Sequence, residues 1–181
     1  VGQGHPQNNA GIAGVVPYAR TLGDYNGDSH ADLFWRDSES GAILLWQSAN
    51  AHTPRTLATV ADRDWHVVAE GDFDGDRVAD VFWRHARSGA NAIWRSGLRS
   101  RTLAVPAVTN LDWDVAGTGD FDGDGRSDLF WRNHATGRNV IWLGANPSTR
   151  QSVARVPTAP WVLVAIGDYD AFDHRADLYW H

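Results

Sequence analysis

The chain has 181 residues, of which 43% are hydrophobic, and its formal net charge is −6. This length and apolar content suit one folded domain and exclude a disordered chain. The acidic balance argues against a nucleic-acid partner, which would require a basic face. No apolar run approaches the roughly 18 residues that a membrane span needs, so we expect no membrane insertion.

The charged residues are unevenly chosen, because all sixteen basic residues are Arg and twenty of the twenty-two acidic residues are Asp. Asp is a poor helix former and is typical of turns and of loops that bind cations through oxygen. The absence of cysteine excludes disulfides and cysteine metal sites. The first residues lack a Met and the features of a signal peptide. We therefore expect a processed mature form or a piece of a longer chain.

The predicted elements begin with a short apolar strand at residues 12–16. A repeated string follows, and its four copies start 48 residues apart: GDYNGDSHADLFWR at Gly23, GDFDGDRVADVFWR at Gly71, GDFDGDGRSDLFWR at Gly119 and GDYDAFDHRADLYWH at Gly167. Three turn glycines keep the same step: Gly41, Gly89 and Gly137. A fixed period of this length is typical of repeat architectures.

The second repeat predicts four short strands, at residues 65–69, 80–84, 90–94 and 102–105, which are β-branched and aromatic runs bounded by turn residues. Four strands in a unit of this length predict a β-propeller blade. The apolar runs fit sheets that are covered on both faces. We therefore predict an all-β fold, with one propeller domain over residues 1–181. Its repeats lie approximately at 15–62, 63–110, 111–158 and 159–181, the last completed by the N-terminal strand.

The fourth repeat stops after its second predicted strand. The chain could form a small four-bladed ring that its two termini close. It could equally form part of a larger propeller, completed by further chain or by a second copy in a homo-oligomer. The sequence leaves these arrangements open.

Each repeated string places oxygen-bearing side chains at positions 1, 3, 5 and 9 of a loop. Several carboxylates in so short a turn would repel one another unless a cation joined them. Calcium takes six to eight oxygen ligands, whereas zinc would require His or Cys, and the Glu that an EF-hand needs at position 12 is replaced by Trp. Ordinary Asx-turns are the alternative. We predict up to four structural Ca²⁺ ions, held by Asp24, Asn26, Asp28, Asp32, Asp72, Asp74, Asp76, Asp80, Asp120, Asp122, Asp124, Asp128, Asp168, Asp170, Asp173 and Asp177, and by the backbone carbonyls of His30, Val78 and Arg126.

The unit G-D-[FY]-[DN]-G-D-x-x-x-D-[LV]-[FY]-W-R resembles the FG-GAP/VCBS repeat family, whose calcium loops also occur in the propellers of integrin α-chains. The resemblance covers residues 15–181, and only the fourth loop departs from it, by one inserted residue. It implies propeller blades, calcium loops between strands and an extracellular setting, often in secreted bacterial proteins. The family includes lectins, adhesive ectodomains and accessory domains of hydrolases, so it does not fix a ligand.

The ten tryptophans follow the repeat in three columns: Trp35, Trp83, Trp131 and Trp180; Trp65, Trp113 and Trp161; and Trp46, Trp94 and Trp142. The first column lies in apolar runs and predicts packing between blades. The third lies at strand ends beside polar residues, where an exposed indole could stack on a sugar ring.

We therefore predict a non-catalytic recognition module of a secreted protein that binds glycans or a cell-surface protein multivalently. A structural or protein-interaction propeller attached to a secreted hydrolase is the alternative. An enzyme is disfavoured, because the sequence contains no G-x-S-x-G or H-E-x-x-H motif and no phosphate-binding glycine loop.

Overall fold

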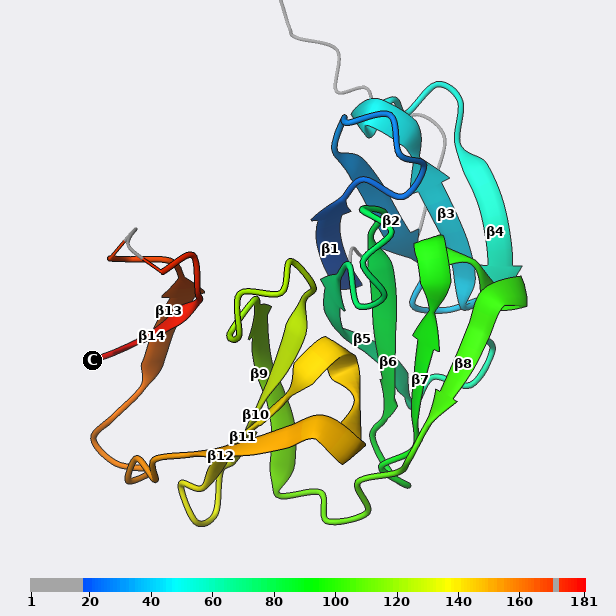
Figure 1. Ribbon diagram of the computed structural model, residues 1–181. Coiled ribbons are helices and arrows are strands. Elements are labelled where there is room, and N and C mark those ends of the chain that lie inside the picture. Colours follow the sequence, from blue (N-terminus) through cyan, green and yellow to red (C-terminus); the bar gives the residue numbers. More distant parts are fainter. Residues whose placement is uncertain (1–17, 171–172) are drawn as a thin grey trace, which may run out of the picture.

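The computed structural model describes residues 18–170 and 173–181, so the strand predicted at residues 12–16 lies outside it. The described residues form an all-β fold of three four-stranded antiparallel meanders and one two-stranded sheet (Figure 1). The first sheet contains β1 (Tyr18–Gly23), β2 (Asp32–Arg36), β3 (Ala42–Trp46) and β4 (Arg55–Thr59). The second contains β5 (Trp65–Gly71), β6 (Asp80–His85), β7 (Asn91–Trp94) and β8 (Thr102–Val105). The third contains β9 (Trp113–Gly119), β10 (Asp128–Asn133), β11 (Asn139–Trp142) and β12 (Arg150–Val153), and the last contains β13 (Leu163–Gly167) and β14 (Asp177–Trp180).

Short 3₁₀ turns follow the third strand of each complete sheet: η1 (Gln47–Ala49), η2 (Arg95–Gly97) with η3 (Arg99–Arg101), and η4 (Leu143–Ala145) with η5 (Pro147–Thr149). None of the helices in the described ranges is long and apolar enough to cross a membrane.

The four strands predicted for the second repeat are confirmed, within two residues at every end. Turn chemistry explains the register of each meander. Gly89 has a φ of 69° in the turn before β7, and a Cβ there would collide with the carbonyl oxygen of Val108. Only glycine tolerates both the left-handed backbone and the close approach. The predicted turn glycines Gly41 and Gly137 have the same conformation.

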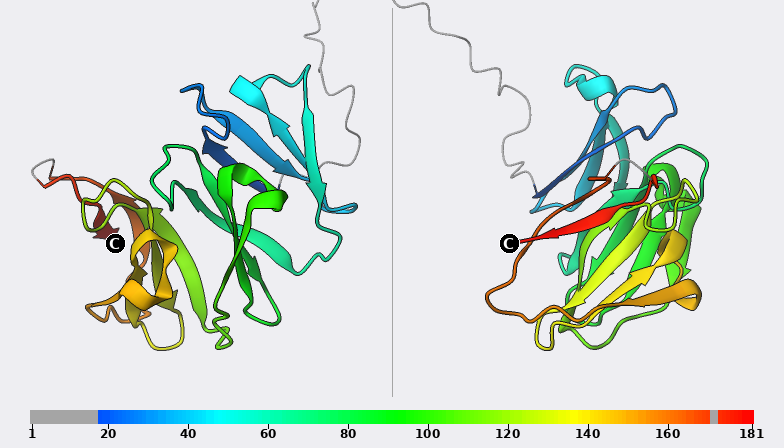
Figure 2. Two further views of the ribbon diagram at one scale, coloured as in Figure 1. Left: turned by 45° about the vertical axis from the view of Figure 1, so that its right-hand side comes forward. Right: turned by 60° about the vertical axis from the view of Figure 1, so that its left-hand side comes forward.

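The sheets follow one another in sequence order as an open series of blades (Figures 1 and 2). The first strands of successive sheets contact each other, so that β5 touches both β1 and β9, and β9 touches β13. The fold is β-propeller-like, as the repeat predicted. The blade number of a closed ring stays a prediction.

The hydrophobic core lies between consecutive sheets. Phe82 of the second sheet packs edge-on against Trp131 of the third, with ring centroids 6.2 Å apart, and the equivalent pairs Phe34–Trp83 and Phe130–Trp180 are 6.3 and 6.2 Å apart. Such aromatic pairs contribute roughly 1 kcal/mol each beyond the apolar area that they bury. The predicted role of the first tryptophan column in blade packing is confirmed, since Trp83 and Trp131 are both only 1% exposed.

An arginine ladder adds a second link between the blades. The guanidinium groups of Arg36, Arg84 and Arg132 lie 5.7, 5.1 and 4.7 Å from the ring centroids of Trp83, Trp131 and Trp180, each in the next sheet. Arg84 also donates to the backbone carbonyls of Val108 and Trp113, at 3.1 and 3.0 Å. The planar guanidinium thus joins cation–π contact with several hydrogen bonds, which a lysine could not reproduce.

Candidate metal centres and interblade grooves

The four aspartate-rich loops join the first strand of each sheet to the second. Consecutive loops are hydrogen-bonded to each other, because the residue at position 8 of one loop donates its N–H to the position-1 carbonyl of the preceding loop. These bonds run from Ala79 to Asp24 at 2.7 Å, from Ser127 to Asp72 at 2.7 Å and from Ala176 to Asp120 at 2.6 Å. The candidate sites are therefore neighbours along one edge of the blade series.

The position-1 carboxylate organises each loop. In the second loop, Asp72 accepts backbone N–H bonds from Gly75 at 2.6 Å, Asp76 at 3.1 Å and Arg77 at 2.7 Å. Asp24 and Asp120 make equivalent bonds in their loops. Gly75 has a φ of 83°, as expected for the predicted turn glycine, and the equivalent Gly27 and Gly123 are also left-handed. The loops wrap around this first carboxylate as Asx-turns do.

A second left-handed residue in each loop was not predicted. It lies at position 6 and is Ser29, Arg77, Gly125 or His174, with φ between 57° and 83°. Only the third loop has glycine there, so residue type alone gave little indication of it. The conformation costs energy in a non-glycine residue and persists where the surrounding contacts enforce it.

The position-9 aspartates Asp32, Asp80 and Asp128 are completely buried at the start of the second strands. Asp80 accepts N–H bonds from Phe73 in its own loop at 3.1 Å and from Ser96 in η2 at 2.8 Å. Asp128 is bonded in the same way to Phe121 and Gly144, at 2.8 and 2.7 Å. This link to the turn after the third strand, made by Ser48 in the first sheet, was not predicted from the sequence.

Burial raises the pKa of Asp80 and of Asp128 to about 6 each, against the lowering effect of their backbone hydrogen bonds. The negative charges of neighbouring loop carboxylates raise these pKa values further. Asp74 and Asp76 act on Asp80, and Asp122 and Asp120 act on Asp128. Across the described ranges, no Arg or His side chain forms an ion pair with either buried carboxylate. A buried charge without a counter-ion is unfavourable, and a cation in the loop would remove this cost.

The structure brings positions 1, 3 and 9 together. In three loops, one carboxylate oxygen from each residue lies within 4.8 Å of the others: Asp72, Asp74 and Asp80; Asp120, Asp122 and Asp128; and Asp168, Asp170 and Asp177. In the first loop Asn26 replaces the middle carboxylate between Asp24 and Asp32. These groups offer only oxygen donors, which fit a hard cation such as Ca²⁺ and not zinc.

The position-5 aspartates are not members of these groups. Asp28, Asp76 and Asp124 instead accept the N–H of the residue at position 7, at 2.9, 2.8 and 2.8 Å. The predicted carbonyl ligands at position 7 belong to these same residues, His30, Val78 and Arg126, and their contact with a metal stays a prediction.

The fourth loop keeps this pattern around its insertion. Asp173 accepts the N–H of Arg175 at 3.0 Å, as the position-5 residues of the other loops do, so Asp173 takes position 5. Asp177 accepts the N–H of Tyr169 at 3.0 Å but is only half-buried. The two-stranded sheet has no third strand with a following turn to cover it among the residues described.

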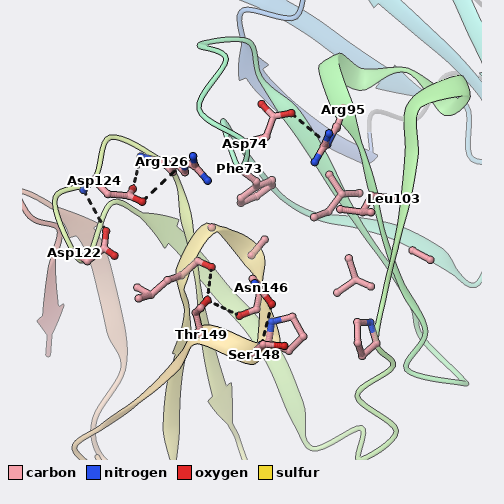
Figure 3. A pocket seen from close by; sticks show the side chains of 18 residues that line it. Phe73, Asp74, Arg95, Leu103, Asp122, Asp124, Arg126, Asn146, Ser148 and Thr149 are labelled. Carbon is pink, nitrogen blue, oxygen red and sulfur yellow. Dashed lines mark hydrogen bonds and ion pairs between the residues drawn. The ribbon is translucent and has the colours of Figure 1, made fainter.

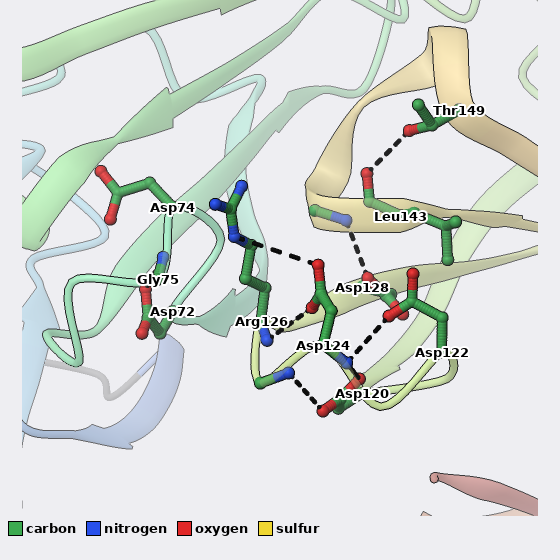
Figure 4. A network of polar contacts seen from close by, with 12 residues as sticks. Asp72, Asp74, Gly75, Asp120, Asp122, Asp124, Arg126, Asp128, Leu143 and Thr149 are labelled. Atoms are coloured by element: carbon green, nitrogen blue, oxygen red, sulfur yellow. Dashed lines mark hydrogen bonds and ion pairs between the residues drawn. The ribbon is translucent and has the colours of Figure 1, made fainter.

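Two arginine side chains lie beside the second and third loops. Arg95 in η2 pairs with Asp74 at 3.2 Å, and Arg126 lies between the two loops, 4.0 Å from Asp124 (Figure 4). Beside them a cavity of about 590 Å³ opens between the second and third sheets, with Phe73 in its wall and the exposed side chain of Leu103 at its rim (Figure 3). The loops thus border a space that is both polar and apolar.

Two other cavities lie between consecutive blades and are lined by equivalent residues of successive repeats. The first has a volume of about 460 Å³ and the second about 360 Å³. Six lining positions correspond at the 48-residue step: Val60, Trp65, Trp83, Ala92, Trp94 and Thr102 in the first groove, and Val108, Trp113, Trp131, Val140, Trp142 and Arg150 in the second. We call these two cavities the interblade grooves. Each has three indoles in its wall and polar residues at its margin.

The prediction that the third tryptophan column is exposed is wrong for two of its members. Trp94 and Trp142 are only 5% and 7% exposed, because each ring packs against the first-column tryptophan of its own sheet at 4.8 and 4.6 Å. Trp46 makes the same contact with Trp35 at 4.7 Å and is half-buried. Trp94 and Trp142 still line the interblade grooves, but the more accessible indoles there are Trp65 and Trp113.

The aspartate loops have counterparts in a known protein family. Residues 24–83 match the family of FG-GAP-like repeats. This segment runs from the first aspartate loop through the second to Trp83, and the third and fourth loops repeat its pattern further along the chain. No curated protein matches the chain. The resemblance to FG-GAP repeats inferred from the sequence is thereby confirmed over residues 24–83.

Proposed function

We propose that this chain, which matches FG-GAP-like repeats over residues 24–83, is a calcium-stabilised, non-catalytic recognition module of a secreted protein, and that it binds carbohydrate in its interblade grooves. The observation that carries the proposal is the recurrence of one three-tryptophan groove at two successive blade interfaces. A catalytic site usually occurs once in a chain, whereas a repeated groove suits repeated weak binding.

The calcium part of the proposal rests on the three-carboxylate groups and on the buried position-9 aspartates. A bound Ca²⁺ would neutralise these carboxylates. Asp80 would then tie its loop to η2 without an uncompensated charge, and the neighbouring loop would be held through the bond from Ser127 to Asp72. A chain without disulfides would gain its stiffness in this way. Calcium sites of extracellular modules bind in roughly the 10⁻⁴–10⁻³ M range, which suits a secreted protein.

The carbohydrate part rests on the chemistry of the grooves. A pyranose ring has an apolar face, which stacks on an indole, and hydroxyl groups, which need hydrogen-bond partners. Trp65 offers the indole in the first groove, with Asp62 and Arg99 beside it, and Trp113 does so in the second, with Arg138 and Ser152. Both volumes fall within the range of small-molecule sites. Two or more equivalent sites would raise the affinity for a surface that bears many copies of one sugar.

A glycan array probed in ~1 mM calcium and again in excess chelator tests the proposal. We expect calcium-dependent binding to one related set of glycans. Trp65→Ala and Trp113→Ala should each weaken this binding, and the double variant should abolish it. Trp161→Ala is the matched control, because Trp161 belongs to the same column but precedes a two-stranded sheet, which has no third or fourth strand to complete a groove among the described residues.

A blank array from a folded, calcium-loaded sample would contradict carbohydrate binding and leave calcium stabilisation untouched. Conversely, isothermal titration that detects no calcium binding would contradict the metal proposal, whatever the array shows.

A further inference from the structure

The two interblade grooves share their tryptophans but differ in charge. Arg138 and Arg150 line the second groove, and no acidic side chain from the described ranges lines it. The first groove instead has one arginine, Arg99, and one aspartate, Asp62, whose charges offset each other. The second groove is therefore cationic, whereas the first is close to neutral.

This difference comes from two departures from the repeat. One repeat earlier in the chain, Arg138 corresponds to Ala90 and Arg150 corresponds to Thr102. The second sheet forms the same four antiparallel strands as the third with alanine and threonine at these positions, so the blade does not require arginine there in order to fold. The two arginines are better explained by what the groove contacts than by the packing of the sheet.

The arginines of the two grooves also differ in their contacts. In the first groove, Arg99 donates to the backbone carbonyl of Thr59 at 2.7 Å, so part of its guanidinium group is already engaged. In the second groove, the exposed side chains of Arg138 and Arg150 form no ion pair or hydrogen bond with any residue that the structure describes. Both guanidinium groups are therefore available to a negatively charged ligand.

The two arginines lie at opposite ends of β11. Arg138 directly precedes this strand, and Arg150 of β12 is paired with Trp142 at the other end. Between them Val140 and Ser152 are paired with each other and line the same groove. Four residues of extended chain span about 13 Å. A ligand that contacts both guanidinium groups therefore needs negative charge at more than one point along its length.

We propose that the second interblade groove binds an oligosaccharide of uronic acid units, with carboxylates on Arg138 and Arg150 and a sugar ring on Trp113. This proposal rests on the proposed function of the grooves and names the class of sugar that one of them takes. A guanidinium group binds a carboxylate through two parallel N–H bonds, which add direction to the attraction between the charges. A neutral sugar would lack this contact, and an anion without sugar rings would leave the indole unused.

The test is isothermal titration of the chain with trimers of galacturonate and of glucuronate, each compared with its carboxyl-reduced counterpart at one fixed calcium concentration. We expect an acidic trimer to bind at a single site per chain, and roughly tenfold or more tightly than its neutral counterpart, because charge-assisted hydrogen bonds are lost on reduction. Trp113→Ala should remove this binding, since it takes away the stacking surface.

Exchanging residues between the grooves tests the two arginines directly. The double substitution Arg138→Ala and Arg150→Thr gives the second groove the residues of the first, and it should abolish the preference for the acidic trimer. The reverse exchange, Ala90→Arg with Thr102→Arg, should create a second acid-binding site per chain. Arg155→Ala is the matched control, because it removes an exposed arginine just after β12 that lines neither groove, and it should leave the preference unchanged.

The possible failures of this proposal and of the proposed function are distinct. Equal affinity for acidic and neutral trimers would overturn the uronate assignment and leave carbohydrate binding intact, and so would an array that shows binding to neutral glycans alone. A preference for acid that survives the Arg138→Ala and Arg150→Thr exchange would also overturn it. Equally strong competition by polyglutamate would do the same, since charge alone would then explain the binding. No binding to any glycan or trimer would contradict the proposed function as well.

Discussion

The third and fourth aspartate loops have nearly the same sequence pattern but different surroundings. Asp128 is buried and accepts N–H bonds from its own loop and from the turn after β11. Asp177 is half-buried and, among the described residues, accepts an N–H bond only from Tyr169 of its own loop. The third strand of a blade, with the turn that follows it, is therefore what encloses the position-9 carboxylate.

This difference shows how a metal and a blade would stabilise each other. An enclosed carboxylate is costly without a cation, so a complete blade has more to gain from one. In an open loop such as the fourth, the carboxylates stay hydrated, so their charge costs less free energy. We therefore expect the loops of the four-stranded sheets to bind metal more tightly than the loop of the two-stranded sheet.

The largest expected effect is that of removing calcium altogether. Calcium at about 100 times its dissociation constant stabilises a folded chain by roughly 2.7 kcal/mol per site, or about 8 kcal/mol for three sites. In a chain of this size that change corresponds to a fall in Tm on the order of 20 °C. Differential scanning calorimetry in calcium and in chelator measures it, with magnesium as the control ion. Equal Tm values in both buffers would contradict a structural role for calcium.

Asparagine substitutions at position 9 compare the two loops directly. Asp128→Asn should lower the free energy of unfolding in calcium by roughly 3 kcal/mol, because it removes a ligand and leaves one buried N–H facing an amide nitrogen. Asp177→Asn should cost under about 1 kcal/mol, since the side chain is partly hydrated. Urea denaturation in calcium measures both losses, and isothermal titration should find one strong site fewer in Asp128→Asn only. Similar losses for the two variants would show that enclosure by the third strand is unimportant.

Most of the loop chemistry could be predicted from the sequence, because the repeat fixes which residues share a loop. The groups Asp72–Asp74–Asp80 and Asp120–Asp122–Asp128 follow from spacing alone. The bond from Ser96 to Asp80 could not be predicted, because it joins residues 16 positions apart through a backbone N–H, which any residue type supplies. Repetition likewise placed Trp94 at a strand end but could not show that Trp83, on the neighbouring strand, would cover it.

Glycine-to-alanine substitutions at the ends of the first strands give a smaller effect. Gly119→Ala should destabilise the chain by about 2 kcal/mol, because its Cβ would lie 2.6 Å from that of Ala176 and 3.0 Å from a methyl of Ile166. Gly167→Ala should be neutral or slightly stabilising, since the position is open and alanine restricts the unfolded chain. Chemical denaturation checks both values. A marked loss of stability in Gly167→Ala would mean that the chain already crowds that position.

The smallest expected effect is a pH dependence that reverses with calcium. Without metal, the pKa values of Asp80 and Asp128 are about 6 in the folded chain, against 3.8 for an unperturbed Asp. The folded state then binds more protons than the unfolded state between about pH 4 and 6, so stability rises as the pH falls, by about 1 kcal/mol per group from pH 7 to 5. In saturating calcium, protons compete with the ion for the same carboxylates, so stability should fall over this range. Urea midpoints at pH 7, 6 and 5, in calcium and in chelator, measure both trends. Asp128→Asn should lose about half of the gain in chelator, because it removes one of the two groups, and an unchanged gain would assign the titration to other residues.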